Sequence, residues 1–400
     1  MTHPEKLRMK DYFDLALIGS THGLSDGFSS LLVPVLILIV AEFNLSPSRT
    51  GMLLSASHVA AFLILYPISL LADHGGKKKL ILLIGMSFAA AAFFSMRWVQ
   101  GFAGIAVLAL AAGAGNAAYH PCGTALAAER FPSRRALAIS FHGLMGNIGA
   151  SIMPIIQAGV AVASGWRSAV VVCSLPALIL LPLVAFRFPD GRPQASTEPA
   201  TMTIRDSILA ISATVFKNRK IMLLALIYAL KGMGTKAMIG FVPLLAAEKY
   251  GMRTTLIGTG LTLYFGMGIA AKPIMGYLYS RWGARTALFM PLAISGTIAL
   301  AMGLSPWPAL FLVLLACLGA TGPVSPIVLT AAADFSDKKT LASSVGFIYT
   351  CHSLGFLSPL LGGWLADKYG LIMPFILGAF FIWLSAILST SLPSIDRSQE

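Results

Sequence analysis

Long apolar stretches, separated by short polar turns, run through the whole chain. A helix needs about 20 apolar residues to cross the hydrocarbon core of a bilayer, where only helices and closed barrels satisfy their backbone polar groups. The stretches lack the period-2 alternation of barrel strands, so the pattern predicts an all-α membrane protein. Charges, Pro-Gly clusters and turn residues divide it into twelve transmembrane helices. We expect these spans near residues 12–41, 49–72, 79–97, 101–127, 135–163, 166–187, 219–248, 255–280, 285–304, 307–333, 340–368 and 371–393.

Composition supports the same fold class. The chain is 56% hydrophobic and only 11% charged, with a mean hydropathy of +0.79, whereas a soluble domain carries about 25% charged residues. These values exclude a water-soluble fold. The net charge of +13 would suggest nucleic acid as partner of a soluble protein, but here the basic residues lie in short loops between apolar runs. We therefore expect the lipid bilayer, and no nucleic acid, as the surrounding partner.

The distribution of Lys and Arg predicts the orientation in the membrane. Of the 29 basic residues, 20 fall in segments that would be cytoplasmic if both termini are inside. Six fall in the outer loops and the other three lie within spans. Positively charged loops stay on the cytoplasmic side, so we expect cytoplasmic N and C termini in a multi-pass protein of the inner membrane. The charged N-terminus precedes an apolar run too long for a cleaved signal peptide, which favours a retained first span.

A single long polar connection divides the chain almost in half. Residues 188–218 join the sixth predicted span to the seventh. We expect an N-terminal six-helix bundle over 1–187, a cytoplasmic linker over 188–218 and a C-terminal six-helix bundle over 219–400.

The two halves resemble each other along the sequence. At an offset of 209 residues, Leu15-Ala16-Leu17-Ile18 pairs with Leu224-Ala225-Leu226-Ile227, and Gly23 pairs with Gly232. At an offset of 205, the pairs that match are Pro121 with Pro326, Glu129 with Asp334, Pro154 with Pro359, and Gly165 with Gly370. Parallel six-helix repeats related by pseudo-twofold symmetry are the arrangement of the major facilitator superfamily (MFS fold), with the substrate site between the halves near the midplane.

A loop motif adds to the resemblance to this superfamily. The stretch LLADHGGKKKL, residues 70–80, resembles the family's G-x-L-x-D-R-x-G-R-K-x signature, with Asp73 and Lys77 at matching positions. Its counterpart in the second half, GYLYSRWGAR, keeps Arg281 and Arg285 but has Ser280 in place of the acid. The resemblance implies a gating role for Asp73, Lys77, Arg281 and Arg285. The alternative is a solvated charged turn that only follows the positive-inside rule.

Within the superfamily, residues 117–154 resemble the fosmidomycin-resistance-type transporters, which carry a similar aromatic-His-Pro in span 4 and Gly-Asn-x-Gly in span 5. The drug-antiporter signature G-P-x-x-G-G is degraded in span 5, around Pro154, although Ser358 to Gly363 match it in the second half. Drug efflux therefore stays open.

Ionisable residues within the spans mark candidate functional groups, because each costs about 2.5–3.5 kcal/mol at the centre of a membrane helix on insertion scales. Asp26 is the one acid deep within a predicted span, and His22 lies one helical turn before it. A carboxylate-based proton relay must use Asp26, so we expect proton coupling by Asp26 and His22. The alternative is a structural pair that ties span 1 to span 7.

Lysines dominate the second half. His22 aligns with Lys231 in the repeat, and Asp26 aligns with Thr235 beside Lys236. One of the two lysines is expected to pair with Asp26, which leaves the other for substrate. With Lys272, three intramembrane lysines face one carboxylate, and this balance favours an anionic substrate such as a phosphonate, a phosphate ester or an organic carboxylate. Lys272 is the one of the three most suited to reach the interface.

Four further polar residues complete the predicted substrate site. His120 and His142 lie at similar depth in spans 4 and 5 and could form a relay, or His120 could cap a carbonyl freed by the kink at Pro121. Asn147 and His352 are repeat equivalents in spans 5 and 11, and they face either the cavity or a neighbouring helix.

These features predict a secondary active transporter that moves a small, anionic solute or drug across the inner membrane by alternating access, coupled to protons. A transport-inactive sensor or scaffold, or a flippase of the same fold, is the alternative. Enzyme motifs such as H-E-x-x-H and G-x-S-x-G are absent. We expect a monomer with no cofactor. We also expect no metal, because the four cysteines lack metal-type spacing and suit the core; they are Cys122, Cys173, Cys317 and Cys351.

Overall fold

The computed structural model is helical throughout the residues it describes, which are 8–75, 77–188, 214–336 and 341–393. Eight helical stretches in these ranges are long and apolar enough to cross a membrane. The two longest, Leu137–Arg187 and Thr254–Leu304, have 51 residues each. At 1.5 Å per residue, either one suffices for two crossings of a hydrocarbon core about 30 Å thick. The helices account for the twelve predicted spans.

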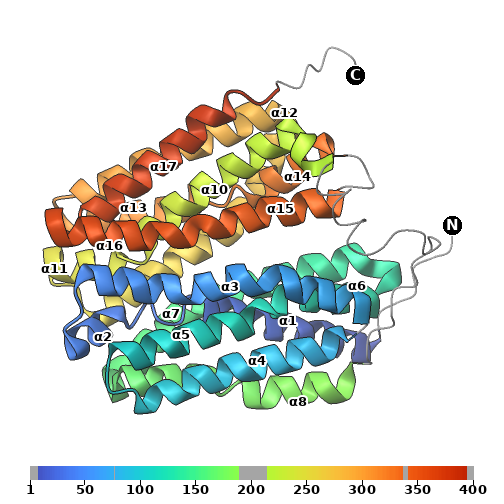
Figure 1. Ribbon diagram of the computed structural model, residues 1–400, viewed down its shortest axis with the longest axis horizontal. Coiled ribbons are helices and arrows are strands. Elements are labelled where there is room, and N and C mark those ends of the chain that lie inside the picture. Colours follow the sequence, from blue (N-terminus) through green and yellow to red (C-terminus); the bar gives the residue numbers. More distant parts are fainter. Residues whose placement is uncertain (1–7, 76, 189–213, 337–340, 394–400) are drawn as a thin grey trace. The chain divides into compact units, whose positions relative to one another are not determined.

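The described residues of the first half form eight α-helices, labelled in Figure 1. They are α1 (Met9–Ser29), α2 (Leu36–Phe43), α3 (Pro47–Gly75), α4 (Lys78–Ser95), α5 (Phe102–Ala117), α6 (Tyr119–Arg130), α7 (Arg135–Ser174) and α8 (Ala177–Arg187).

The described part of the second half contains α10 (Arg219–Ile239), α11 (Val242–Tyr250), α12 (Thr254–Leu304), α13 (Pro308–Thr321), α14 (Ser325–Phe335), α15 (Leu341–Ser353), α16 (Leu357–Tyr369) and α17 (Met373–Ser389). A short 3₁₀ turn, η3 (Leu354–Phe356), connects α15 to α16.

Several spans predicted as continuous helices are interrupted, which corrects their predicted bounds. Span 1 breaks between α1 and α2, span 4 at Ala118, span 7 at Gly240 and Phe241, and span 10 between α13 and α14. The breaks obey the repeat, since position 118 and the 322–324 gap differ by about the 205-residue offset seen in the sequence. Irregular backbone at membrane depth is tolerated where protein or a polar cavity satisfies it.

Glycines with positive φ make three of the turns between spans. Gly165 (φ 79°) bends α7 and Gly283 (φ 70°) bends α12, so each long helix folds back as two spans. Gly370 (φ 91°) separates α16 from α17. The sequence pairs Gly165 with Gly370, and both adopt the conformation that side chains with a Cβ rarely adopt.

The chain divides into two compact units. The first comprises Met1–Leu45, Met52–Ala195 and Arg253–Gly266, and the second comprises Ser46–Gly51, Ser196–Met252 and Met267–Glu400. The start of α3 thus belongs to the second unit, and the start of α12, which corresponds to it in the repeat, belongs to the first. The boundaries 1–187, 188–218 and 219–400 stay a prediction, and most of the linker lies outside the described residues.

Backbone contact between helices holds the first unit together. A Cβ added to Gly149 of α7 would lie 2.0 Å from the carbonyl oxygen of Gly23 in α1. In the second unit Gly232, the repeat partner of Gly23, packs against the ring of His352, and Gly355 of η3 lies against Gly232. Gly143 of α7, in contrast, has no atom within 4 Å of an added Cβ.

Charged residues tie together the ends of helices in the first unit. Asp14 is completely buried and accepts hydrogen bonds from Arg130 and from Arg187, whose Nε is 2.5 Å away. The start of α1 and the ends of α6 and α8 therefore lie at the same end of this unit, as an even number of crossings between them requires.

A second charged cluster lies at the opposite ends of α1–α2 and α7, beside the turn at Gly165. Glu42 accepts hydrogen bonds from Arg167 at 2.6 Å and from Trp166 at 2.7 Å. The hydrogen bond from Arg167 is the main cause of the lowered pKa of Glu42.

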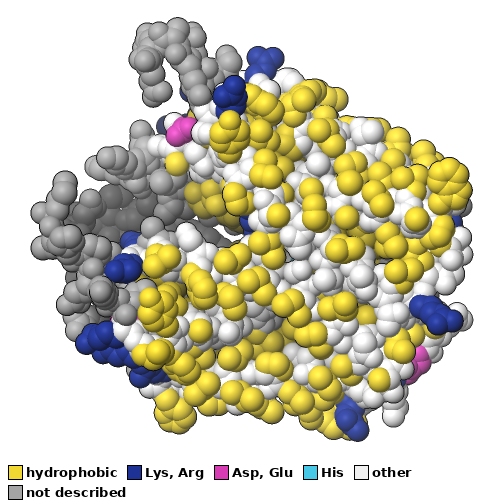
Figure 2. All heavy atoms as spheres, turned by 180° about the vertical axis from the view of Figure 1, so that it is seen from behind, with side chains coloured by type: hydrophobic (Ala, Val, Ile, Leu, Met, Phe, Trp, Pro, Cys, Tyr) yellow, Lys and Arg dark blue, Asp and Glu magenta, His cyan; other side chains and the backbone are white. Residues whose placement is uncertain are grey.

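The surface carries many large exposed hydrophobic side chains. Figure 2 shows one face covered largely by hydrophobic side chains, with Lys and Arg mostly at its edges. Large exposed side chains such as Phe186, Leu178 and Val313 belong to this surface, as expected for helices that face lipid. Among the cysteines, Cys122 and Cys173 are buried, whereas Cys317 is exposed, so its predicted core position is wrong.

We expect Gly149→Ala to lower the unfolding temperature of the detergent-purified protein, because the new methyl group must displace the backbone of α1. Overpacking of this kind costs about 1–3 kcal/mol. Gly159→Ala is the matched control on the same helix, since Gly159 is exposed and has no atom within 4 Å of an added Cβ. There the better helix propensity of alanine should leave stability unchanged or raise it by up to about 1 kcal/mol. Equal shifts in the two variants would contradict the role of this contact.

Candidate functional site

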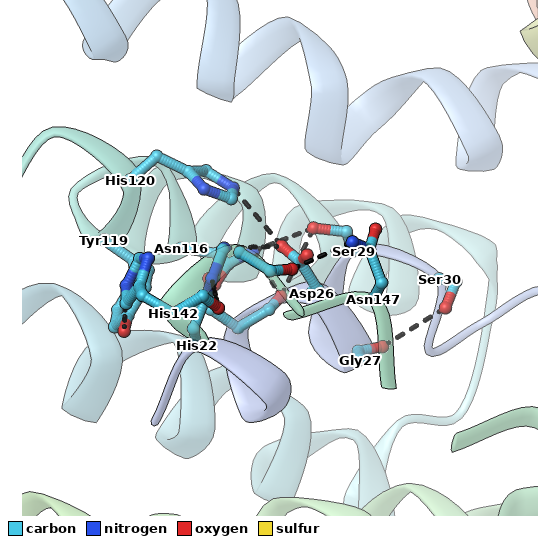
Figure 3. Close-up of polar contacts among 12 residues, drawn as sticks. His22, Asp26, Gly27, Ser29, Ser30, Asn116, Tyr119, His120, His142 and Asn147 are labelled. Carbon is cyan, nitrogen blue, oxygen red and sulfur yellow. Dashed lines mark hydrogen bonds and ion pairs between the residues drawn. The ribbon is translucent and has the colours of Figure 1, made fainter. Parts of the chain in front are cut away.

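The centre of the candidate site in the first unit is the pair His22 and Asp26 on α1. Their Nε2 and Oδ1 atoms are 3.4 Å apart, and the side chains are 11% and 23% exposed. The i, i+4 spacing places them on one face of the helix, as the sequence predicted. Figure 3 shows both side chains pointing toward groups contributed by α5, α6 and α7.

The imidazole of His22 is held in one orientation by α7. Its Nδ1 lies 2.7 Å from the carbonyl oxygen of His142. A carbonyl oxygen only accepts, so Nδ1 carries a proton and donates it. The Nε2 atom, which faces Asp26, then carries the free electron pair of the neutral ring. The two imidazoles stack at a centroid distance of 4.0 Å and an angle of 16°, so a positive charge on both at once would be strongly unfavourable.

His142 is fixed in turn by Tyr119. The hydroxyl of this completely buried tyrosine donates to the carbonyl oxygen of Ile18 at 3.0 Å and lies 3.1 Å from Nε2 of His142. The one hydroxyl proton is used by Ile18, so the arrangement that satisfies both contacts has Nε2–H of His142 donating to the tyrosine oxygen. His142 therefore supports His22 rather than facing solvent.

His120 approaches Asp26 from the other side. It lies in the first turn of α6, directly after the break at Ala118, and its Nε2 is 3.7 Å from Oδ1 of Asp26. Its side chain is 49% exposed, in contrast to His22. The ring of His120 meets that of His22 edge-on at 5.4 Å. The predicted proximity of His120 and His142 thus arises through His22, which lies between them.

Asn116 is a site residue that sequence reasoning missed. Its amide nitrogen donates to the Ser25 carbonyl at 3.0 Å and to the Ser29 hydroxyl at 3.1 Å, while its oxygen accepts from the Ser25 hydroxyl at 2.8 Å. These bonds fasten α5 to α1 beside Asp26 (Figure 3). The spacing of Asn116, Tyr119 and His120 places polar groups on one face of an otherwise apolar span, and this was the available signal.

Asn147 lies on α7 one turn after Gly143. Its amide donates to the Gly143 carbonyl at 2.9 Å within the same helix. Figure 3 shows the side chain on the Ser29 side of the site.

In the second unit, the predicted lysines lie along α10. Lys231 and Lys236 are both partly buried and close enough for electrostatic repulsion, and Lys272 of α12 repels Lys231 in the same way. Lys236 also contacts η3, because its Cδ would be 3.0 Å from a Cβ at Gly355. Asp26 belongs to the other unit, so its pairing with a lysine stays a prediction.

His352, on α15, stacks on Tyr228 at a centroid distance of 4.2 Å and an angle of 26°. The ring of Tyr228 also meets that of Tyr349 edge-on, at a centroid distance of 5.8 Å. The repeat equivalents Asn147 and His352 therefore both come from the helix that packs on α1 or α10, but one is an amide bonded within its helix and the other an aromatic stack.

The predicted gating residues are placed only in part. Lys77 is exposed at the start of α4, and Arg281 and Arg285 are exposed on either side of the bend at Gly283. The side chain of Asp73, at the end of α3, lies outside the described residues. Nearby, Lys78 binds Glu129 at 2.5 Å, and Tyr279 donates to Asp334. The two acids paired by the repeat are thus both bound at the ends of their spans.

The first unit brings together groups that can carry a proton, and the second unit brings together groups that carry positive charge. In the first unit an imidazole nitrogen faces a carboxylate, and a second imidazole completes a cluster whose three ligand atoms lie within 4.8 Å of one another. In the second unit three ammonium groups gather on α10 and α12.

Two curated resistance proteins are similar in sequence to part of the chain. The fosmidomycin resistance protein of Escherichia coli K12 is 25% identical over 190 residues, which are 46% of this chain and 47% of the relative. The class H tetracycline resistance protein of Pasteurella multocida is 27% identical over 175 residues, 43% of this chain and 44% of the relative. The chain thus matches less than half the length of these two curated relatives.

Solved transporter structures share the fold over nearly the full length. A bacterial homologue of the human lysosomal transporter Spinster, in an inward-facing and unoccupied conformation, matches with a TM-score of 0.81 and 13% identity, covering 96% of this chain and 97% of the other. A mutant of the nucleoside transporter NupG matches with a TM-score of 0.75 and 14% identity, covering 94% and 98%.

The sequence profile described as Major Facilitator Superfamily matches residues 18–258 and 224–399, which together span almost the whole chain. With twelve spans, a repeated six-helix pattern and ionisable groups inside both units, the chain belongs to the Major Facilitator Superfamily and is a multi-pass membrane transporter rather than an enzyme.

Proposed function

We propose that this transporter moves a small anionic solute across the inner membrane by alternating access and couples the movement to protons. The observation that carries the proposal is the different chemistry at equivalent positions of the repeat. The position of His22 and Asp26 in α1 is taken in α10 by Lys231 and by Thr235 beside Lys236. One half is suited to exchange a proton, and the other is suited to attract a negative charge.

The proton is assigned to the pair His22 and Asp26. With Nδ1–H donated to the His142 carbonyl, a neutral His22 presents an electron pair to a carboxylate oxygen 3.4 Å away. Two acceptors that face each other are unfavourable, and a proton on Nε2 converts them into an ion pair. Partial burial strengthens this preference. The pair therefore has a reason to hold a proton in one state of the cycle and to release it when its surroundings change.

The anion is assigned to the lysines of α10. Burial makes the ammonium groups of Lys231 and Lys236 costly at membrane depth, and the repulsion of Lys231 by Lys272 and of Lys236 by Lys231 adds to this cost. A single carboxylate neutralises only one of them. A phosphonate, a phosphate ester or an organic carboxylate would offset this cost. His352, Asn147, His120 and His142 supply hydrogen-bonding or positioning groups. An anionic drug fits the same site, and the names of the two curated relatives favour export as the direction.

The proposed setting is the inner membrane with both termini cytoplasmic and the transporter acting as a monomer. The excess of basic residues in the predicted inner segments supports the orientation. Thermal stabilisation against a panel of anionic, zwitterionic and cationic solutes tests the substrate class, because a ligand raises stability by RT ln(1 + [L]/Kd).

We expect Asp26→Asn to abolish transport driven by a proton gradient, while substrate exchange and binding continue, because an amide neither takes up nor releases the coupling proton. The measurement is uptake or efflux in proteoliposomes with and without an imposed pH gradient. Asp11→Asn is the control, since Asp11 lies at the start of the same helix and caps its backbone. Gradient-driven transport by Asp26→Asn at the parental rate would refute the proton assignment.

Lys231→Gln and Lys236→Gln should behave differently from each other. Substitution of the lysine that pairs with Asp26 should abolish proton coupling. Substitution of the other lysine should raise the half-saturation concentration for the anion tenfold or more and leave coupling intact. This size follows because truncating one partner of a buried charge pair costs about 2–5 kcal/mol in binding. Lys220→Gln, at the start of the same helix, is the control. Unchanged anion affinity in both variants, or stabilisation only by cations, would count against an anionic substrate.

Asp73→Ala should shift the balance between inward- and outward-open states with little change in substrate affinity for either. The family resemblance places this residue beside the basic turn that begins at Lys77, which favours a gating role over a binding role. Cysteine accessibility from the two sides of the membrane measures the balance. An unaltered accessibility pattern with normal turnover would leave Asp73 as a solvated turn residue.

A further inference from the structure

Three side chains with electron pairs suited to a metal ion meet in the first unit, although the sequence predicted no metal. The Nε2 atoms of His22 and His120 lie 3.4 and 3.7 Å from Oδ1 of Asp26. All three ligand atoms are within 4.8 Å of one another. Bonds of about 2.0–2.2 Å to a tetrahedral ion place its ligands about 3.3–3.6 Å apart. We propose that His22, Asp26 and His120 bind a divalent first-row transition-metal ion.

The orientation of His22 is the one that metal-binding histidines adopt. Its Nδ1–H is donated to the carbonyl oxygen of His142 at 2.7 Å. This bond fixes the tautomer and directs the free electron pair of Nε2 toward Asp26, as outer-shell carbonyls do at known metal centres.

The ligands are held by packed helices. His22 and Asp26 share one face of α1, whose backbone contacts α7 at Gly149. A Cβ at Gly146 would lie 2.5 Å from Oδ2 of Asp26 and 2.6 Å from Cε1 of His22. Only a glycine at this position leaves both ligands their present places. His120 reaches the same point from the start of α6 (Figure 3).

The donor set favours a particular class of ion and an exchangeable site. Two imidazoles and one carboxylate suit Zn²⁺, Co²⁺, Ni²⁺ or Fe²⁺, whereas Mg²⁺ and Ca²⁺ prefer oxygen ligands alone. Three protein ligands leave one position of a tetrahedral ion open to water or to a donor atom of a solute. His120 is the most exposed of the three ligands, with 49% of its side chain accessible.

The ion would occupy the electron pairs on Nε2 of His22 and Oδ1 of Asp26, to which the coupling proton is assigned above. A bound metal ion therefore blocks proton uptake by His22 and Asp26. This consequence rests on the proposed proton coupling, whereas the binding of the ion does not.

Titration of the chelator-treated, full-length protein in detergent with Co²⁺ and Zn²⁺ tests the site without any gradient. The expected result is one ion per chain, with the visible absorption of tetrahedral Co²⁺. His22→Ala and His120→Ala should each weaken binding at least tenfold, because loss of an outer-shell partner alone costs about 10–100-fold. His58→Ala is the matched control, since it removes a histidine from α3 in the same unit.

His120→Cys supplies a positive readout that a merely structural role would not produce. A thiolate at this position should retain the ion and add a sulfur-to-cobalt charge-transfer band. Thermal unfolding without metal shows that each variant is folded. Absence of stoichiometric binding to the parent protein, or equal affinity in the parent, His22→Ala and His120→Ala, would overturn the metal site.

Proton coupling by His22 and Asp26 is tested separately, with Asp26→Asn in the pH-gradient transport assay without metal. In the parent, Zn²⁺ should inhibit gradient-driven transport in step with its occupancy. Gradient-driven transport that continues at saturating Zn²⁺ would overturn the shared use of these electron pairs.

Discussion

The close approach of α1 to α7 is the constraint on which the candidate site depends. Helices in lipid gain nothing from hydrophobic burial against each other, so their association depends on packing and hydrogen bonds, and small residues allow both. The contact between Gly23 and Gly149 brings the His142 carbonyl within hydrogen-bond distance of His22. A wider separation would release the imidazole, and with it the orientation of Nε2 toward Asp26. The packing of the bundle therefore determines the chemistry.

The second unit uses the same contact for a different purpose. Gly232, the repeat partner of Gly23, packs against His352 and Gly355 on the helices that correspond to α7. Here the neighbouring ionisable groups are lysines, and the aromatic stack is His352 on Tyr228. Duplication thus preserved the backbone contact and the breaks in the spans, while the side chains beside them diverged into acid and imidazole in one unit and ammonium groups in the other.

The spans, the repeat and the pairing of His22 with Asp26 could be predicted because they depend on local spacing and apolar length. The break at Ala118 agrees with the kink expected at Pro121, because this proline has no N–H to bond the Ala117 carbonyl. Asn116 and Tyr119 were missed because a single polar side chain in an apolar run gives no indication of its partner. The metal cluster was missed for the same reason, since His120 is 94 residues from Asp26 along the chain and only the fold brings them together.

Charged groups within a membrane protein also explain why binding can drive a conformational change. An unprotonated imidazole that faces a carboxylate is costly at low dielectric, and so is a group of lysines without an anion. A ligand shifts a conformational equilibrium only by the difference in its affinity for the two states. A site that is costly when empty provides such a difference whenever one state admits water and the other excludes it. On this argument the polar cluster around Asp26 and the lysines of α10 need not touch each other to be coupled. It is enough that the same rearrangement changes the solvation of both.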